Sequence, residues 1–522
     1  MSKFCDNLFL FTRRPACEVR IGKTVIGGNN PVAVQTMTNR DTNDTEACVE
    51  QIAAAAREGC RIVRLTTQGT REARNLAEIA ARTHTEWPEV ALVADVHFLP
   101  AAADVAADSA DKVRINPGNY NDKGGALDAL LEKCARRGVA LRIGVNHGSL
   151  STRMFDLYGD TPEGMVASAM EYLRACRERN FHNVVVSMKS SNVRVMIYAY
   201  RMLVEAMQRE EMNYPLHLGV TEAGDGNEGR IKSAVGIGAL LADGIGDTIR
   251  VSLTEEPERE VVAGRMLVDY MADRQEDAVA LDSAAAEAFE QKYSPFEYCR
   301  NVSEQVGRVG GNCVPLLCSE MTKEERAGVC AIEAVGKNPV AEWRRAIARK
   351  EAEGDHRPVM LSRTYSVGSA DELRIKAAAD FGVMFVDGLA DAIDIRCSEV
   401  SEEEELKGVM LDILQASRVR ISKTEYISCP GCGRTLYDLQ GTLAQIKERT
   451  SHLKELKIGV MGCIVNGPGE MADADYGYVG AARGKVSLYR GKEVVCRNIP
   501  QDEALDKLVE LIKADGRWTE QE

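Results

Sequence analysis

Eight short apolar segments rich in β-branched residues alternate with helical patterns through the first half of this chain, and this alternation constrains the fold most. The predicted strands are 32–38, 61–67, 91–98, 112–117, 140–146, 183–189, 215–222 and 247–253. Eight strand–helix units over roughly 250 residues predict an α/β fold, an N-terminal (β/α)8 TIM barrel, rather than a doubly wound open sheet. Residues 18–28 are expected to form a hairpin that caps the barrel floor.

The chain has 522 residues, which exceeds the size of one ordinary hydrophobic core, so further domains are expected. We predict the barrel over 1–272, an inserted α/β domain over 273–410 and a C-terminal α+β domain over 411–522. The boundaries follow the end of the eighth strand–helix unit and an acidic run at 402–405, which is typical of a solvated linker.

The charge balance excludes several classes of partner. The chain carries 79 acidic and 65 basic residues, for a net charge of −14, which argues against general binding to nucleic acid or to an anionic membrane. No apolar run approaches the ~18–20 residues that span a bilayer, and the N-terminal segment is a poor signal peptide. We therefore expect a cytoplasmic protein whose 15 cysteines are reduced thiols or metal ligands.

Polar side chains gather where the predicted barrel strands end, which is the end that carries the active site in such barrels. Most come in i, i+2 pairs, whose members point to the same side of a sheet. They are Arg64, Asp95, His97, Arg114, Asn116, Arg142, Asn146, Ser187, Lys189, Glu222, Arg250 and Ser252.

Five of these residues are cations, and they would repel one another at one barrel mouth unless an anion were bound there. They are Arg64, Arg114, Arg142, Lys189 and Arg250. Because the fork of arginine suits phosphate oxygens, we infer a small phosphate ester or diphosphate as the ligand. Asp95, His97 and Glu222 are the candidate proton-transfer groups.

Three cysteines near the C-terminus indicate a metal site. The motif SCPGCGR supplies Cys429 and Cys432, and Cys463 ends a later apolar strand. After Cys463 the turn Asn466-Gly467-Pro468-Gly469 leads to Glu470, which it could fold back toward the thiols. Two alternatives stay open on spacing alone: zinc with Cys496 as a fourth thiolate, or a [4Fe–4S] cluster with Glu470 on one iron.

The middle of the chain repeats part of the barrel. Residues 230–252 align without a gap to 374–396, with nine of 23 positions identical at a constant offset of 144. The chemical residues do not repeat: Arg250 corresponds to Asp394 and Glu222 to Ser366. We interpret this echo as a decayed duplication with a structural or domain-positioning role.

Taken together, the motifs resemble a known family. The segments VADVHF, RINPGN, RIGVNHGSLS, SMKSSN, HLGVTEAG, GIGDTIRVSL, SCPGCGR and MGCIVNGPGE are similar to those of the 4-hydroxy-3-methylbut-2-enyl diphosphate synthase family. This is the iron–sulfur enzyme family of the methylerythritol phosphate route to isoprenoids. The inserted segment and the spelling NHGSLS resemble its longer, plant-like, three-domain form.

The resemblance implies a substrate, a cofactor and roles for the residues. The substrate would be 2-C-methyl-D-erythritol 2,4-cyclodiphosphate, reduced with ring opening and loss of a hydroxyl. A [4Fe–4S] cluster would be held by Cys429, Cys432, Cys463 and Glu470, and Glu222 would donate the proton. Asp95 would lie near the reacting carbons or orient His97. The residues that would bind substrate are Arg64, His97, Arg114, Asn116, Asn146, Lys189, Arg250 and Ser252.

The electron donor and the assembly stay open at this point. Flavodoxin and ferredoxin both fit the resemblance. In shorter family members the cluster domain of one subunit meets the barrel of the other, so a homodimer and a site complete within one chain both fit. Two rival functions also stay open: another kind of TIM-barrel enzyme with a structural zinc site, and a non-catalytic iron–sulfur sensor.

Overall fold

The computed structural model describes residues 4–120, 122, 124–274, 281–400, 402–465 and 467–520. The chain divides into two compact units. The first comprises Met1–Arg14, Arg230–Ile245 and Arg265–Ser422, and the second comprises Pro15–Gly229, Gly246–Gly264 and Lys423–Glu522. The second unit thus holds the barrel strands together with the C-terminal sheet. None of the described helices is long and apolar enough to cross a membrane.

The predicted parallel barrel is confirmed, with all eight strands in the expected places. They are β3 (Ala33–Met37), β4 (Ile62–Thr67), β5 (Ala91–Val96), β6 (Lys112–Ile115), β7 (Ala140–Asn146), β8 (Val184–Lys189), β9 (His217–Leu218) and β10 (Thr248–Ile249). The strand order is β8-β7-β6-β5-β4-β3-β10-β9. Strands β8 and β9 stand at the two ends of this order. A parallel bridge between Val186 of β8 and Leu216, just before β9, joins them and closes the ring.

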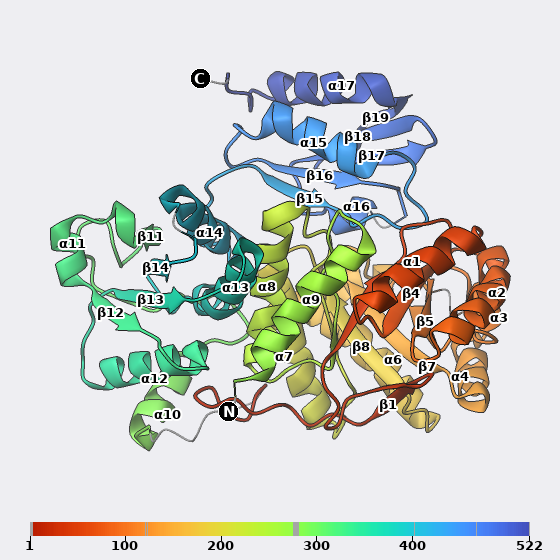
Figure 1. Cartoon of the computed structure of the whole chain (residues 1–522), viewed down its shortest axis with the longest axis horizontal. Helices are drawn as coiled ribbons and strands as arrows, with labels where there is room; N and C mark the ends of the chain where they lie inside the picture. Colours follow the sequence, from red (N-terminus) through yellow and green to blue (C-terminus); the bar gives the residue numbers. More distant parts are fainter. Residues whose placement is uncertain are drawn as a thin grey trace. The chain divides into compact units, whose positions relative to one another are not determined.

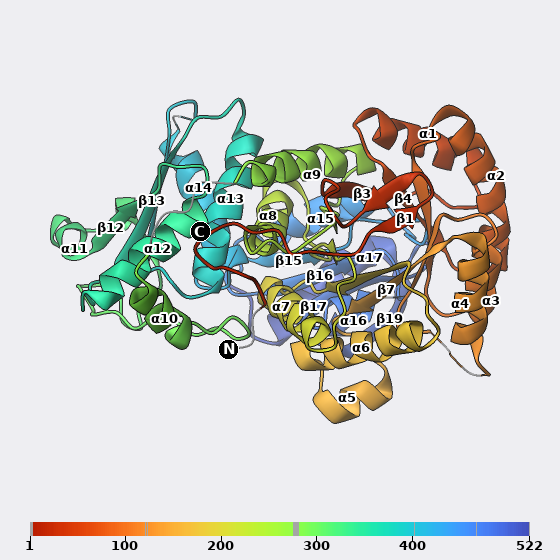
Figure 2. The ribbon, with the colours of Figure 1, turned by 90° about the horizontal axis from the view of Figure 1, so that it is seen from below.

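Helices follow the strands as a (β/α)8 pattern requires, and Figure 1 shows α1 to α4 on the outer side of strands β4 and β5. Side-chain caps at Asp44, Ser151 and Asn192 satisfy free backbone N–H groups where three of these helices begin. Figure 2 shows α5 as a short helix that projects beyond α6. The helices are α1 (Thr45–Arg57), α2 (Thr70–Glu86), α3 (Pro100–Ala106), α4 (Ala126–Arg137), α5 (Thr152–Tyr158), α6 (Pro162–Glu178), α7 (Val193–Arg209), α8 (Gly226–Ala242) and α9 (Pro257–Ala272).

The predicted hairpin also forms, as the antiparallel pair β1 (Val19–Ile21) and β2 (Thr24–Ile26). Its buried side chains pack against Ile62, Ala91 and Ala140, which are the first residues of their barrel strands. The hairpin therefore covers the N-terminal end of the barrel, opposite the end where the polar strand residues lie.

Two barrel strands, β9 and β10, are shorter than the predicted strands 215–222 and 247–253. Beyond Leu218 the chain leaves the β-ladder, and Glu222 adopts a left-handed backbone with φ 49°. Ala223 then pairs with Ser428 in a parallel bridge. The expected strand 215–222 stops early because its last residues turn to meet the C-terminal sheet.

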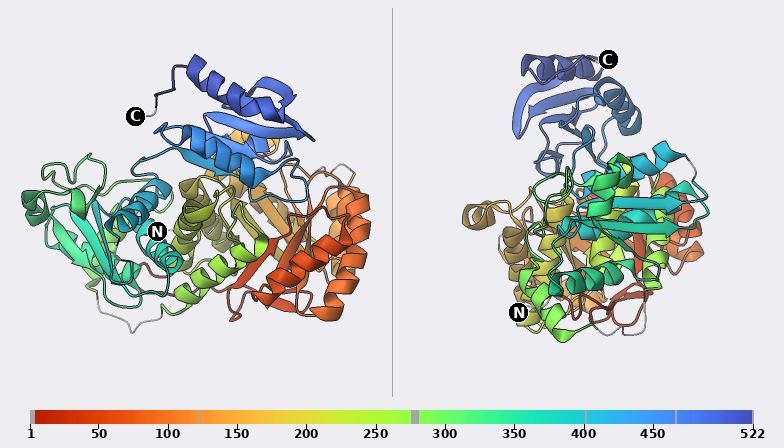
Figure 3. Two further views of the ribbon diagram at one scale, coloured as in Figure 1. Left: turned by 45° about the horizontal axis from the view of Figure 1, so that its top comes forward. Right: turned by 90° about the vertical axis from the view of Figure 1, so that its left-hand side faces the viewer.

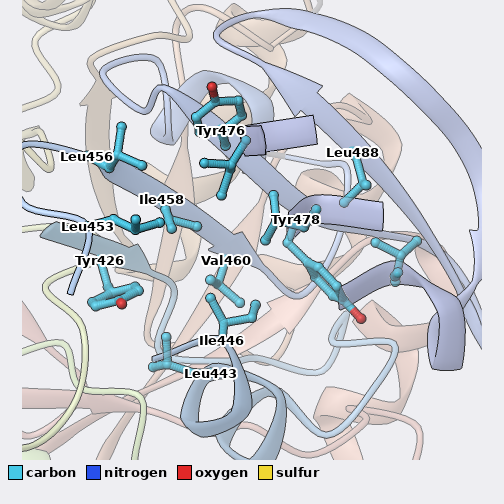
Figure 4. Close-up of a cluster of buried hydrophobic side chains, with 14 of the residues drawn as sticks. Tyr426, Leu443, Ile446, Leu453, Leu456, Ile458, Val460, Tyr476, Tyr478 and Leu488 are labelled. Atoms are coloured by element: carbon cyan, nitrogen blue, oxygen red, sulfur yellow. The ribbon is translucent and has the colours of Figure 1, made fainter. Parts of the chain in front are cut away.

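That sheet has the order β15-β16-β17-β18-β19, parallel from β15 to β17 and antiparallel from there on. Alternate residues such as Ile458, Tyr478 and Leu488 form one core with α15 and α17, drawn in Figure 4. Figure 3 shows α17 lying along the sheet. The elements are β15 (Glu425–Ser428), α15 (Leu439–Thr450), β16 (Lys457–Met461), α16 (Gly467–Glu470), β17 (Tyr476–Ala482), β18 (Lys485–Arg490), β19 (Glu493–Pro500) and α17 (Gln501–Ala514).

The middle segment has the predicted α/β character. Its four strands form a parallel sheet of order β11-β14-β13-β12. They are β11 (Leu316–Leu317), β12 (Cys330–Glu333), β13 (Val359–Tyr365) and β14 (Ala392–Cys397). The helices are α10 (Ser283–Lys292), α11 (Lys323–Gly328), α12 (Pro339–Ala352), α13 (Ala370–Val386) and α14 (Glu403–Ala416), with a 3-10 turn at Cys318–Glu320.

The sequence echo has a structural counterpart in α8 and α13. The two helices have bounds that differ by 144 at both ends, which is the offset of the sequence repeat. A Cβ added to Gly238 would lie 2.7 Å from Cα of Ala379, and one added to Gly382 would lie 2.8 Å from Cγ1 of Val235. Gly238 and Gly382 are equivalent positions in the repeat, as are Val235 and Ala379. The two repeated helices therefore pack on each other at equivalent positions, where the glycine of each helix lies against Val235 or Ala379 of the other.

Candidate active site

One cavity collects the polar barrel residues and the C-terminal cysteines within the second unit. It has about 660 Å³ of empty space, including solvent at its mouth. The barrel lines it with Met37, Arg64, Asp95, His97, Arg114, Arg142, Asn146, Lys189, Thr221, Glu222, Arg250 and Ser252. The C-terminal segment lines it with Cys429, Pro430, Gly431, Cys432, Arg434, Met461, Gly462, Cys463, Gly467 and Glu470.

Neighbouring strands place three charged residues side by side on the barrel wall. Asp95, Arg114 and Arg142 are register partners on β5, β6 and β7. Nη1 of Arg114 donates to Oδ1 of Asp95 at 3.1 Å, and its Nη2 donates to the carbonyl of Gly144 at 3.0 Å. A Cβ on Gly144 would lie 2.5 Å from Nε of Arg114, so glycine at that position leaves room for the guanidinium.

Asp95 is the counter-ion at this end of the barrel. Burial alone would raise the pKa of its carboxyl, but Arg64, His97 and Arg114 outweigh burial and hold that pKa well below its usual range. Asp95 is therefore ionised at neutral pH. A buried, permanently ionised carboxylate among cations suits orientation and charge balance better than proton donation.

Two other cations in the cavity, Arg142 and Lys189, have no carboxylate hydrogen-bonded to them among the described residues. Burial, and then Arg64 and neighbouring cations, lower the pKa values of Arg142 and Lys189 well below their usual range. Nε and Nη1 of Arg142 have no hydrogen-bond partner in the described part of the chain. Unpaired buried cations are costly, and a bound anion would remove much of that cost. The geometry therefore favours an anionic ligand here.

Arg250 is held by a residue that sequence reasoning missed. Its guanidinium donates from Nε and Nη2 to the two carboxylate oxygens of Glu260 on α9, at 3.0 and 2.9 Å. Thr36 and the backbone N–H of Leu253 also donate to Glu260, at 2.7 and 3.1 Å. Both side chains of the ion pair are almost fully buried, at 3% and 2% exposure. Glu260 thus fixes the direction in which Arg250 faces the cavity.

Replacing Glu260 by Gln is expected to destabilise the fold by about 3–5 kcal/mol, because it leaves the Arg250 charge buried without its partner. Denaturant unfolding measures the change. The double variant Glu260→Gln/Arg250→Met is the control, and it should be more stable than the single variant because it removes the orphaned charge. Equal stability of the single variant and the wild type would contradict this account.

Two carboxyl groups meet where the barrel faces the C-terminal segment. Nδ2 of Asn146 donates to Oε1 of Glu470 at 2.8 Å, and Oγ of Ser191 donates to the backbone carbonyl of Glu470 at 3.0 Å. Burial and the neighbouring Glu470 raise the pKa of Glu222 well above its usual range. This raised pKa favours the protonated carboxyl, the form that a proton donor needs.

The backbones come into close contact at the same place. A Cβ on Gly148, in the loop after β7, would lie 2.0 Å from the carbonyl oxygen of Gly469, and Gly148 has φ +81°. Only glycine satisfies both demands. Lys423 pairs with Glu228 at 2.6 Å on another part of the contact. The C-terminal segment is thus fitted onto the barrel of its own chain, and the cavity takes residues from both.

The three predicted cysteine ligands and Glu470 all line the cavity, as described above. The backbone N–H of Gly462 donates to Sγ of Cys429 at 3.3 Å. Burial is the largest influence on Cys429 and Cys463 and raises the pKa values of both thiols. Thiols in such a place bind a metal by exchanging their protons for its charge.

Cys496, the fourth thiolate of the zinc alternative, lies elsewhere. It is on β19, opposite Leu488, and it packs against the core of the C-terminal sheet. Within the described residues no three Cys, His, Asp or Glu side chains converge closely enough to hold a single ion. Asn466, in the predicted turn before Glu470, lies outside the described residues.

The cavity contains every predicted barrel residue that was assigned a role except Asn116. The amide of Asn116 donates to Oγ of Ser149 at 3.0 Å and accepts from the backbone N–H of Gly118 at 3.0 Å, so it shapes the loop after β6. Sequence reasoning missed Met37, Thr221 and Arg434, which also line the cavity. Arg434 could have been found from its place two residues after Cys432 in the cysteine motif.

Comparison with known proteins agrees with this arrangement. The family description "GcpE TIM-barrel domain" matches residues 16–265, and "GcpE protein C-terminal domain" matches residues 425–514. The chain belongs to the GcpE family. The two matched ranges contain every residue that lines the cavity.

Relatives in this family match along nearly the whole chain. The chain is 44% identical to 4-hydroxy-3-methylbut-2-en-1-yl diphosphate synthase (flavodoxin) of Parabacteroides distasonis, over 98% of this chain and 99% of that protein. It is 44% identical to the enzyme of the same name from Porphyromonas gingivalis, over 98% and 100%. For Akkermansia muciniphila the identity is 42%, over 99% of each. These alignments include the middle segment, so the long form predicted from the sequence is confirmed.

Solved structures match only the fold of about half the chain. A 7,8-dihydropteroate synthase from Vibrio fischeri covers 50% of this chain and 100% of its own, at 11% identity and a TM-score of 0.35. A likeness at that level carries no argument about function.

Proposed function

We propose that this chain reduces 2-C-methyl-D-erythritol 2,4-cyclodiphosphate to 4-hydroxy-3-methylbut-2-enyl diphosphate, with flavodoxin as electron donor. One observation carries the proposal: a single cavity is lined by five barrel cations and also by three cysteines with a glutamate. The relatives' names give the product and the donor. For the substrate dianion, the reaction consumes two electrons and one proton and releases water.

The five cations bind and orient the substrate. Their guanidinium and ammonium groups match the oxygens of a cyclic diphosphate, and arginine can contact two oxygens at once. When the ring opens, a phosphate oxygen leaves with negative charge. Arg142 and Lys189, which have no carboxylate hydrogen-bonded to them in the described part of the chain, are placed to stabilise that charge. Arg114 is instead oriented by Asp95.

Glu222 supplies the proton. Its raised pKa favours the protonated carboxyl. Its backbone is left-handed, and its side chain lines the cavity. Strained backbone of this kind is retained where the surrounding structure fixes it, often at active sites. The proton is transferred to the hydroxyl that leaves as water. Asp95 orients Arg114, with His97 beside it.

The cavity fits a [4Fe–4S] cluster held by Cys429, Cys432, Cys463 and Glu470. The donor set is three thiols and one carboxyl group, of which the carboxyl is the weaker ligand. When bound, such a cluster would supply single electrons and an oxygen-seeking iron. Asn146 and Ser191 hold Glu470 from the barrel side, so the barrel helps to position this fourth ligand.

We propose that the site is complete within one chain, and the proposal is supported by the lining residues, which all belong to the same unit. A homodimer is therefore not needed to build it, and whether the chain dimerises stays a prediction. We further propose a cytoplasmic location. The middle segment, in which α13 packs against α8, would have the positioning role that the sequence echo suggested.

Anaerobic turnover tests the function. The purified chain, reconstituted with iron and sulfide, should convert the cyclic diphosphate into the linear diphosphate with reduced flavodoxin or with dithionite. The product is identified by mass spectrometry and phosphorus NMR. Metal analysis should give about four iron and four sulfide per chain. Stoichiometric zinc without sulfide would eliminate the proposal.

A further inference from the structure

Arg434 stands out among the residues that line the cavity, because it is a cation contributed by the C-terminal segment. It lies two residues after Cys432. Its guanidinium reaches the barrel, where Nη1 lies 3.1 Å from Nδ1 of His97. No carboxylate pairs with it in a salt bridge among the described residues, and its buried Nε has no hydrogen-bond partner there. The cation therefore has N–H groups left for a ligand.

His97 lies between two arginines, and Oδ2 of Asp95 is 4.0 Å from its Nδ1. Its Nδ1 faces Arg434, and its Nε2 lies 3.2 Å from Nη1 of Arg114. A guanidinium only donates hydrogen bonds, and a neutral imidazole accepts at one nitrogen alone. The ring can therefore accept from at most one of the two arginines. An anionic oxygen placed beside them would accept from the other guanidinium.

The same guanidinium acts on the cysteines. It lies in electrostatic range of the sulfur atoms of Cys432 and Cys463, which line the same cavity. The reduction potential of an iron–sulfur cluster depends on net charge and hydrogen bonds around it. A fixed positive charge beside two thiolates favours the reduced, more negative state.

We propose that Arg434 binds a phosphate group of the substrate from the cluster side of the cavity, and that its charge raises the reduction potential of the cluster. This inference rests on the proposed function and deepens it. It means that the anion site is complete only when the C-terminal segment is seated on the barrel. Substrate binding and cluster reduction then share one residue.

Two measurements on Arg434→Met test the proposal without turnover. Calorimetric titration of the unreduced, cluster-loaded enzyme with the cyclic diphosphate should show affinity at least tenfold weaker than wild type. A redox titration followed by electron paramagnetic resonance should show a lower potential, by about 59 mV if the one-electron equilibrium shifts tenfold. Arg434→Lys should keep most of the potential but bind more weakly than wild type, since it retains the charge and loses the fork.

Arg40→Met is the matched control. Arg40 is an exposed arginine whose backbone carbonyl lies 2.6 Å from where a Cβ of Gly433 would be, so it neighbours the same loop outside the cavity. The affinity for the cyclic diphosphate and the reduction potential of the cluster should both stay at wild-type values in this variant. Unchanged affinity in an Arg434→Met protein with normal iron and sulfide would overturn the binding role, and an unchanged potential would overturn the role at the cluster. If that variant fails to hold iron, Arg434→Lys decides the binding role, and Arg434→Gln, which removes the charge and stays polar, decides the role at the cluster.

A titration with inorganic pyrophosphate separates this inference from the proposed function. If the wild type binds pyrophosphate but not the cyclic diphosphate, the proposed substrate is wrong. In that case a loss of pyrophosphate affinity in Arg434→Met still supports the anion-binding role of Arg434. Equal pyrophosphate affinity in wild type and variant overturns that role whatever the substrate.

Discussion

Replacing Glu222 by Gln should lower kcat by roughly 100- to 10,000-fold and leave substrate affinity close to wild type. The amide keeps the size and polarity of the carboxyl group and removes only the proton that it donates. Glu222 lines the cavity beside Glu470, and its burial and that neighbour hold its pKa well above the usual range. Steady-state kinetics with dithionite, together with calorimetric titration of the unreduced enzyme, separate kcat from binding.

The pH profile gives an independent reading of the same group. Glu222 is active while protonated, so its contribution to kcat is full below its raised pKa and is lost as the pH rises through that value. The Gln variant should lack that alkaline limb. A variant that turns over normally but binds substrate poorly would show that Glu222 is a binding residue and not the proton donor.

Replacing Cys429 by Ser should remove the cluster and reduce turnover to less than about a hundredth of wild type. Loss of a residue that only supports a metal ligand already costs roughly 10- to 100-fold, and Cys429 is a proposed ligand itself. Iron and sulfide analysis and the visible absorbance of the anaerobic protein measure the cluster directly.

Cys496→Ser is the matched control, since Cys496 is a thiol of the same domain that lies on β19 away from the cavity. It should keep iron, sulfide and turnover. Glu470→Ala should weaken the cluster, because Glu470 is the proposed fourth ligand. If Cys496→Ser lost the metal while Glu470→Ala kept it, the ligand assignment would be wrong.

The sequence predicted the secondary structure of the barrel closely, because alternating strand and helix patterns are local properties. Its largest error in the barrel is strand 215–222, of which only His217–Leu218 lies in the ladder. Glu222 leaves the strand for a left-handed conformation, and Ala223 pairs with Ser428, which lies 205 residues further along the chain. No local pattern near Glu222 indicates a partner at that distance.

The sequence predicted some residues of the site and missed others. Cations at strand ends, such as Arg64 and Arg250, could be assigned to one mouth because parallel strands in a barrel end together. Glu260 could not, since it lies within a helix whose acidic residues look like an ordinary first turn. Asn116 was predicted for the site from its place at a strand end. Its amide is bonded to Ser149 in the loop, so its role toward substrate stays a prediction.

The sequence by itself determined the barrel, the row of cations at its mouth and the cysteine set near the C-terminus, because periodicity and motif spacing are written in the order of residues. Only the tertiary structure decided that Glu470 meets Asn146, that Gly148 meets Gly469 and that Arg434 reaches His97. These contacts join residues more than 300 positions apart. They depend on backbone close approach and side-chain direction, which packing sets and chain order does not.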